Sequence, residues 1–454
     1  MDFYDIYSQK FYLFSLKRRT LIDFSSEDHN FAYEVEKAFA NIRAVEGGNV
    51  HALYCYKKQM LEEMQSLSEK YKKQYPNVQQ LPAFFKGLEE GDYFIRQRAN
   101  VSLIDLKRSI LEIDSRALGL DVRKADSIFM LKWGRLYQTY DTFSYGFLSD
   151  KIFVGEKEKS KRVCRFCKNT DAKYYKNISH ALQEGLGNHL LFAYEECDKC
   201  NSLFSNSVKK PLFLFLEINR NLSQVRGKHT TIHNQEGLNF QIHPDPITKE
   251  PVVYVMQEYI FNDEYQGKLT GKIYLYNKGP VIYQGVYKAL VKFAVDMIPS
   301  ERMSHFIRTG EWVHGDFMGA DLPAFWYGEQ STFFFEQPII DLFFRSEKSP
   351  SISPYCTAVL YIYDCVFIYI LPYCDIDNEK KLKPEDINRH FEYFKKNEYI
   401  YVQEWVEYDS NDLEGHVAYY KIPIIGIAGK YRVVYRPSSD PIFQIRRENE
   451  KKLS

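Results

Sequence analysis

The sequence predicts a multidomain α+β protein with a helical N-terminal domain, a small cysteine-pinned core and a β-rich C-terminal region. Its 454 residues exceed what one compact domain normally holds. Helical apolar spacing dominates the first third of the chain, and short runs rich in β-branched and aromatic residues dominate beyond residue 208. Two Cys-x-x-Cys pairs lie between these regions. We therefore expect domains at residues 1–154, 155–208, 209–318 and 319–454.

The overall charge of the chain is balanced. Lys+Arg and Asp+Glu each total 60, so the formal net charge is zero. This balance excludes attraction of the whole protein to a polyanion, and any basic surface has to be local. Hydrophobic residues make up 45% of the chain, which excludes disorder throughout, and the 16% of aromatic residues favours β-rich packing.

Three segments of the N-terminal region have the apolar spacing of amphipathic helices. They span Ala32–Val45, Val50–Tyr75 and Val101–Leu118. No group of catalytic residue types accompanies them. We therefore interpret residues 1–154 as a helical scaffold or regulatory domain that binds a partner.

The region beyond residue 208 shows the pattern of short strands separated by turn residues such as Asn277–Pro280. The expected strands are Leu212–Ile218, Val252–Tyr259, Lys272–Tyr276, Thr332–Phe335, Ile339–Phe344 and Ile400–Tyr408. Amphipathic helices are expected at Ile282–Met297 and Pro384–Lys396. The pattern predicts a mixed β/α extension followed by a β-rich C-terminal domain.

The longest apolar stretch, Tyr355–Cys374, has Asp364 at its centre and Pro372 near its end. As a membrane span it would bury a charge within the bilayer. Two strands, Thr357–Tyr363 and Val366–Leu371, joined by a tight turn explain it better, because β-branched and aromatic residues dominate both. No secretory leader opens the sequence. We therefore expect a cytoplasmic protein without a membrane partner.

Four of the eight cysteines form two Cys-x-x-Cys pairs, Cys164/Cys167 and Cys197/Cys200, separated by 29 residues. Each pair can present two thiolates from a tight turn, and two such turns close a tetrahedral zinc site. A disulfide framework is the weaker explanation in a long chain without a leader. Because four protein ligands leave no position for water, this zinc is expected to be structural.

Further signals surround the cysteines. Ile178-Ser-His180 ends a short apolar strand, Gly187-Asn188 follows in a loop, and Glu196-Cys-Asp-Lys-Cys-Asn201 carries the second pair. From Val163 to about Phe204, this order resembles the HNH endonuclease family, whose treble-clef-like ββα-metal core is often pinned by zinc on four cysteines. Asn219–Gly227 and Val281–Trp312 resemble more weakly the β-rich extension of some bacterial HNH proteins.

The resemblance implies roles for three residues. His180 falls at the general-base position, and a neutral imidazole can take a proton from water at physiological pH. Asn201 falls where the family ligates its catalytic cation, Mg²⁺ or Mn²⁺. Asn188 is the nearest candidate for the asparagine that orients the base.

One position departs from the family pattern. The residue before the base is commonly an acid that supplies an oxygen to the catalytic cation, but here it is Ser179. We therefore expect Asn201 to hold the cation together with Glu196 or Asp198, or through water.

Basic residues near the cysteines suggest a nucleic-acid partner. Residues 155–176 contain eight Lys/Arg against three acids. The lysines of this segment, together with Lys199, Lys209, Lys210, Arg226 and Lys228, are expected to contact the phosphates of DNA, with RNA as an alternative.

The resemblance thus implies a metal-dependent endonuclease that cuts DNA. A large module before a small nuclease is typical of a regulated effector, for example in defence against phage, acting with a regulatory protein partner or as a homo-oligomer. The alternative is a non-catalytic, zinc-stapled nucleic-acid-binding or scaffold protein with the same core.

Overall fold

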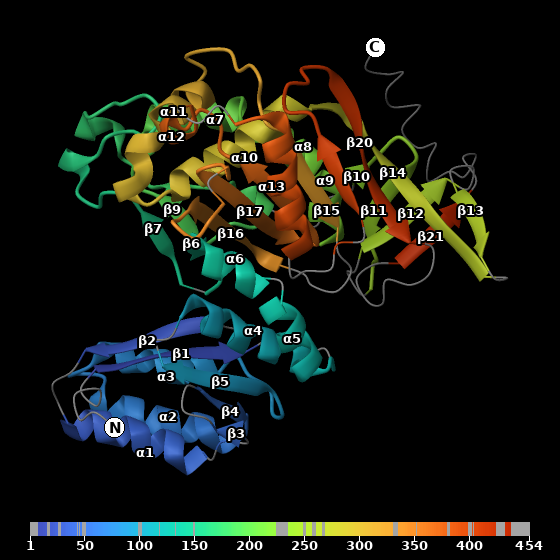
Figure 1. Ribbon diagram of the computed structural model, residues 1–454. Coiled ribbons are helices and arrows are strands. Elements are labelled where there is room, and N and C mark those ends of the chain that lie inside the picture. The colour runs from blue at the N-terminus through green and yellow to red at the C-terminus, as the bar shows by residue number, and fades with distance from the viewer. Residues whose placement is uncertain are drawn as a thin grey trace. The chain divides into compact units, whose positions relative to one another are not determined.

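A computed structural model shows the chain as a mixed α+β protein, which confirms the predicted fold class at this level (Figure 1). It describes residues 8–15, 19–25, 29–42, 44, 46–47, 51–98, 102–117, 119–131, 133–148, 150–223, 235–247, 251–256, 260–265, 268–329, 335–350, 352–378, 382–397, 402, 404–423 and 432–436. The chain folds as two compact units. The first comprises residues 1–141, 146–150 and 396–399, and the second comprises 142–145, 151–395 and 400–454. The boundaries expected at residues 154, 208 and 318 remain predictions.

The first unit is built on a five-stranded antiparallel sheet in the order β2-β1-β5-β4-β3. Its strands are β1 (Ser8–Ser15), β2 (Arg19–Ser25), β3 (Glu46–Gly47), β4 (His51–Cys55) and β5 (Tyr93–Arg98). Its helices are α1 (His29–Ile42), α2 (Lys58–Tyr71), α3 (Gln80–Phe85), α4 (Leu103–Ala117), α5 (Val122–Leu131) and α6 (Trp133–Thr139), with the 3-10 turn η2 (Pro76–Gln79). Apolar side chains of α1, α2 and α3 share one core with the sheet.

The expectation of a mainly helical N-terminal domain did not include the five-stranded sheet on which this unit is built. Helices α1 and α4 confirm two predicted segments, but the third, Val50–Tyr75, is strand β4 followed by helix α2. The strand His51–Cys55 is only five residues long. A mostly apolar run of five residues is compatible with a strand and with one helical turn. Its spacing therefore could not show that a strand precedes helix α2.

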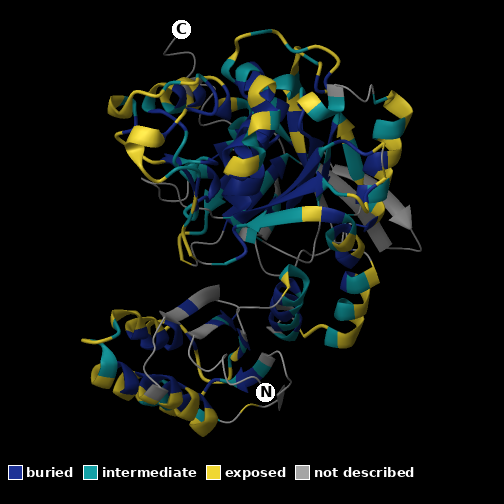
Figure 2. Cartoon of the chain, turned by 60° about the vertical axis from the view of Figure 1, so that its left-hand side comes forward, coloured by how far each residue is buried: buried dark blue, intermediate teal, exposed yellow. Residues whose placement is uncertain are grey.

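The largest sheet of the second unit has six strands in the order β19-β15-β18-β17-β16-β6. They are β6 (Tyr140–Tyr145), β15 (Phe325–Glu329), β16 (Phe335–Arg345), β17 (Cys356–Tyr363), β18 (Cys365–Ile370) and β19 (Trp405–Tyr408). Strands β17 and β18 are the predicted antiparallel hairpin. Every residue of both strands is buried (Figure 2).

Helices cover both faces of this sheet. On one face, Tyr287 of α10 (Tyr283–Met297) donates to the carbonyl of Ile370. On the other, Phe394 of α13 (Pro384–Asn397) packs edge-on against Phe343. Burial on both faces explains why the hairpin sequence is continuously apolar.

Two further sheets complete the β-rich part of the second unit, in the orders β10-β11-β12-β21 and β13-β14-β20. Their strands are β10 (Gln235–Glu236), β11 (Phe240–Pro244), β12 (Pro251–Met256), β13 (Ile260–Tyr265), β14 (Lys268–Ile282), β20 (Gly415–Pro423) and β21 (Arg432–Arg436). The expected turn Asn277–Pro280 was wrong, because these residues lie within β14. The pairing of β14 with β20 shifts register between Tyr276 and Pro280, and such an irregularity accommodates a proline that cannot donate to the ladder.

A small three-stranded sheet, β7-β9-β8, carries the cysteine segment. Its strands are β7 (Ile152–Val154), β8 (Ser179–His180) and β9 (Leu191–Ala193). The accompanying helices are α7 (Asp198–Asn206), α8 (Lys209–Phe215), α9 (Glu217–Leu222), α11 (Ile307–His314) and α12 (Asp375–Asn378), with 3-10 turns η3 (Lys159–Lys161), η4 (Ala172–Tyr174), η5 (Glu184–Leu186) and η7 (Ser300–Phe306). The expected strand Leu212–Ile218 was wrong, because α8 and α9 occupy it. Like β4, it is a short apolar run whose periodicity is ambiguous.

Arg165, which lies between the first two cysteines, ties the cysteine segment to α10. Its buried guanidinium donates to the carbonyls of Val295, Asp296 and Ile298 at the C-terminal end of that helix. It also forms an ion pair with Glu195. The last carbonyls of a helix have no N–H group four residues further on to pair with, and here the buried guanidinium donates to three carbonyls at this end.

Several predicted features lie outside the described residues. They include the phosphate contacts assigned to Arg226 and Lys228 and the start of the expected strand Thr332–Phe335. In the parts of the chain that are described, we find no helix with the length and apolar character needed to cross a bilayer.

Candidate functional site

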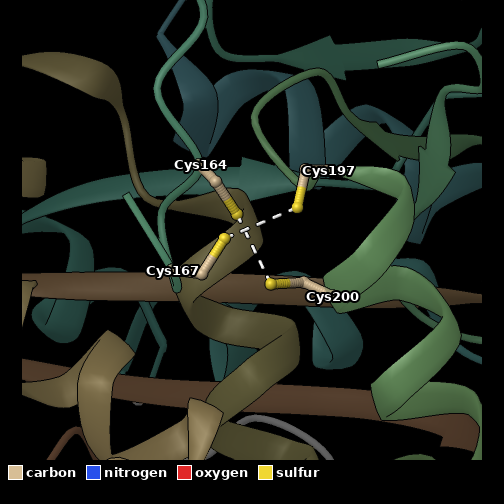
Figure 3. A group of neighbouring side chains, drawn as sticks. All are labelled: Cys164, Cys167, Cys197 and Cys200. Atoms are coloured by element: carbon tan, nitrogen blue, oxygen red, sulfur yellow. Dashed lines mark hydrogen bonds between the residues drawn. The ribbon is translucent and has the colours of Figure 1, made fainter. Parts of the chain in front are cut away.

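The four cysteines of the two Cys-x-x-Cys pairs form one cluster. Cys164 and Cys167 come from the segment between β7 and β8, and Cys197 and Cys200 from the start of α7 (Figure 3). Their sulfur atoms point toward a common centre and all lie within 4.8 Å of one another.

The spacing of these sulfur atoms fits one tetrahedral ion. The Sγ–Sγ distances are 3.7 Å for Cys164–Cys200 and 3.6 Å for Cys167–Cys197. Zinc–sulfur bonds of about 2.3 Å give tetrahedral edges of roughly 3.8 Å. The four side chains can therefore hold a structural metal ion such as zinc.

A pocket of about 380 Å³ lies beside this cluster. It is lined by Ile178, His180, Gln183, Glu184, Gly185, Asn201, Ser205, Lys209 and Phe213, from β8, η5, α7, α8 and the segments next to them. His180 and Asn201, the expected base and cation ligand, thus line one cavity.

The ring of His180 is held in one orientation. Its Nδ1 lies 3.2 Å from the carbonyl oxygen of Asn188. Because a carbonyl only accepts, Nδ1 carries the proton and Nε2 keeps its lone pair. Nε2 lies 3.9 Å from a carboxylate oxygen of Glu184, which also lines the pocket. The nitrogen of His180 that can accept a proton is therefore Nε2, which faces the carboxylate of Glu184.

The side chain of Asn188 fixes the loop that orients His180. Its amide nitrogen donates to the carbonyls of Leu182 and Leu191, and its oxygen accepts from the N–H groups of Leu190 and Leu191. The preceding Gly187 has a φ of 89°, a conformation that glycine adopts without strain. These contacts agree with the orienting position expected of Asn188, whose catalytic role remains a prediction.

Partial burial keeps His180 neutral. Burial lowers its pKa below the ordinary 6.5, and the negative charge of Glu184 only partly offsets this effect. The imidazole is therefore unprotonated across the physiological range, as a general base requires.

Asn201 shares its side-chain oxygen with a lysine. Lys209 on α8 donates to Oδ1 of Asn201 over 3.0 Å. Burial and the nearby charge of Lys292 lower the pKa of Lys209 to about 8. The pocket thus contains a cation of the chain itself, next to the oxygen expected to bind a metal ion.

Glu196 and Asp198, the other expected oxygen ligands, do not line the pocket. Glu196 is fully buried, and its carboxylate accepts from Lys292 of α10 over 2.6 Å. Asp198 accepts from the backbone N–H groups of Lys176 and Asn177, which it joins to the start of α7. Each of these acids already serves a structural partner away from the pocket lining, and their role as cation ligands stays a prediction.

Glu184 is the functional candidate that sequence reasoning missed. Of the described residues that line the pocket, it alone carries a carboxylate. Glu184 follows His180 by four residues. In a loop that contains glycines, this spacing does not indicate that the two side chains lie together. Only the 3-10 turn η5 brings it to the histidine.

The basic segment 155–176 is only partly available to a ligand. Lys157, Lys159, Lys161, Lys173 and Lys176 are exposed, as are Lys199 and Lys210. Arg162, Arg165 and Lys209 are buried. The guanidinium of Arg162 donates to backbone carbonyls, and contact of the expected lysines with phosphate stays a prediction.

Comparison with known proteins adds no assignment. No protein family, curated protein or solved structure matches this chain. Its function therefore has to be inferred from the chemistry of the site.

Proposed function

We propose that the protein is a metal-dependent endonuclease of the HNH type that hydrolyses phosphodiester bonds in DNA. The pocket carries this proposal, because it is lined by both His180 and Asn201. The order β8, β9, α7 beside a four-cysteine cluster supports a treble-clef-like ββα-metal core. We further propose that the cluster holds Zn²⁺ in a structural role.

Each polar residue of the pocket has a separate role in the proposed hydrolysis. Nε2 of His180 takes a proton from water as its oxygen attacks phosphorus, the P–O bond to the leaving sugar oxygen breaks, and that oxygen takes up a proton from solvent. The imidazolium that forms is stabilised by the carbonyl of Asn188 at Nδ1 and by the carboxylate of Glu184 beside Nε2. The ammonium group of Lys209 offers positive charge to the phosphate oxygens.

A divalent cation, Mg²⁺ or Mn²⁺, fits the donors that line this pocket. The carboxylate of Glu184 and the amide oxygen of Asn201 would hold it, because both are the hard oxygen donors that these ions prefer. When bound, the cation supplies Lewis-acid stabilisation of the charge that develops on phosphate. Lys209 has to release Oδ1 of Asn201 for this binding.

Glu184→Gln is expected to raise the Mg²⁺ concentration needed for half-maximal cleavage by at least about tenfold, because it removes a charged ligand. The measurement is a cation titration of cleavage rate. Asp198→Asn is the matched control, and it should titrate as wild type does because Asp198 lies away from the pocket. Equal cation dependence of Glu184→Gln and wild type would remove Glu184 as a ligand.

The pH profile of cleavage follows from the lowered pKa of His180. The base works when neutral, so the rate should rise with pH through that pKa, with the midpoint of the rise below pH 6.5, the ordinary value. Single-turnover rates from pH ~4.5 to ~8 measure this rise. A limb centred above 6.5 would contradict His180 as the titrating base.

The direct test is cleavage by the purified protein. Supercoiled plasmid, single-stranded DNA and RNA are incubated with wild type, with and without Mg²⁺ or Mn²⁺. Cutting that requires an added cation supports the proposal. Absence of cutting with every substrate and cation would favour the alternative, a zinc-stapled nucleic-acid-binding or scaffold protein.

By analogy with nucleases joined to a large second module, we place the activity in a regulated cytoplasmic effector, for example in defence against phage. A regulatory protein partner or a second copy of the chain would control it.

A further inference from the structure

A row of rings crosses the small sheet and ends at His180. Phe153 on β7 is the cross-strand partner of Phe192 on β9, which in turn partners His180 on β8. Directly paired residues project from the same face of a sheet. The ring centroids lie 5.0 Å apart for Phe153 and Phe192, and 4.5 Å apart for Phe192 and His180. The rings of Phe153, Phe192 and His180 therefore form one row that ends at the candidate base.

The outer end of this row is open to solvent. The ring of Tyr194 lies 5.3 Å from that of Phe153, and the two planes differ by 18°. Phe153 is 40% exposed, although it lies in a strand whose other residues are less exposed. The ammonium group of Lys151, an exposed residue, lies 5.4 Å from the centroid of Phe192. An apolar ring surface thus stands beside a positive charge.

We propose that this row binds an unpaired nucleobase of a single-stranded nucleic acid, next to the phosphodiester presented to His180. The inference rests on the proposed function and adds the strandedness of its substrate. Aromatic side chains stack on any base whose face is open, whereas the bases of a duplex are already stacked on their neighbours. Phe153 supplies a partly exposed ring, and Lys151 supplies charge for the backbone beside it. DNA and RNA offer the same base faces, so the row alone does not select between them.

Binding to intact oligonucleotides tests this inference without relying on cleavage. Fluorescence anisotropy is measured for the full-length protein with labelled single-stranded DNA, single-stranded RNA and duplex DNA, without added divalent cation. A denaturing gel afterwards confirms that each probe is intact. Phe153→Ala is expected to weaken single-strand binding by about 5- to 150-fold, the cost of one lost base stack. Duplex binding should change little.

Three variants separate stacking from packing. Phe153→Leu keeps apolar volume but lacks a π face, so it should lose affinity as Phe153→Ala does. Phe153→Trp should bind at least as tightly as wild type. Tyr33→Ala removes an aromatic ring of the first unit that is 66% exposed, and it should bind as wild type does. Equal melting temperatures and metal contents confirm that each variant is folded.

The outcomes separate this inference from the proposed function. Cleavage by wild type, with unchanged single-strand binding by Phe153→Ala, would overturn the inference and leave the nuclease proposal standing. Binding that depends on Phe153, without cleavage under any condition, would support the inference and contradict the nuclease. A protein that binds only duplex, or no nucleic acid, would overturn the inference.

Discussion

Cys164→Ser is expected to leave the protein without its structural metal ion and the second unit unfolded. A neutral hydroxyl replaces a thiolate, so the tetrahedral set loses one of its four ligands. Structural zinc contributes about 10–16 kcal/mol to the folding of zinc-finger peptides. This is comparable to the whole stability of a typical domain, about 5–15 kcal/mol. Thermal unfolding and metal analysis of the purified variant measure both effects.

Cys55→Ser is the matched control for this prediction. Cys55 is half-buried in the first unit and lies outside the four-cysteine cluster. Its replacement should leave metal content at wild-type level. A Cys164→Ser protein that melts as wild type does would show that the cluster does not hold a structural ion.

His180→Ala is expected to reduce cleavage by about 10²- to 10⁴-fold, the usual contribution of a general base. The substitution removes Nε2 but leaves the loop clamped by Asn188, because that side chain bonds to other residues. The fold and the metal content should therefore remain those of wild type. Single-turnover cleavage at saturating protein and cation measures the loss.

A second histidine provides the control for this loss. His305 pairs with Asp375 at the surface and does not line the pocket, so His305→Ala should cut at the wild-type rate. Cleavage by His180→Ala at the same rate as by His305→Ala would remove His180 as the base.

The parts of the site that depend on local spacing could be predicted from the sequence. Two turns of the form Cys-x-x-Cys determine where their own sulfur atoms point, so the grouping of Cys164 and Cys167 with Cys197 and Cys200 required no knowledge of the fold. The hairpin β17–β18 was predicted for a similar reason, because Asp364 interrupts an otherwise uniform run of strand-forming residues.

Contacts between distant segments could not be predicted in this way. Glu196 lies next to a metal-binding cysteine and was expected to serve a cation. Its partner is instead Lys292, which follows it by almost a hundred residues. Lys209 was likewise expected at the surface, but the packing of α8 against α10 buries it. Only the tertiary fold decides which charges are paired and which face the cavity.

The contacts of Arg165 determine how this protein can be dissected. Its guanidinium ends on carbonyls of α10, about 130 residues further along the chain. A fragment trimmed to the cysteine segment would leave Arg165 with Glu195 but without its three carbonyl acceptors, and Glu196 without Lys292. The smallest fragment that keeps these contacts therefore extends beyond the cysteine motif. A design that grafts residues 155–208 onto another scaffold would have to include α10.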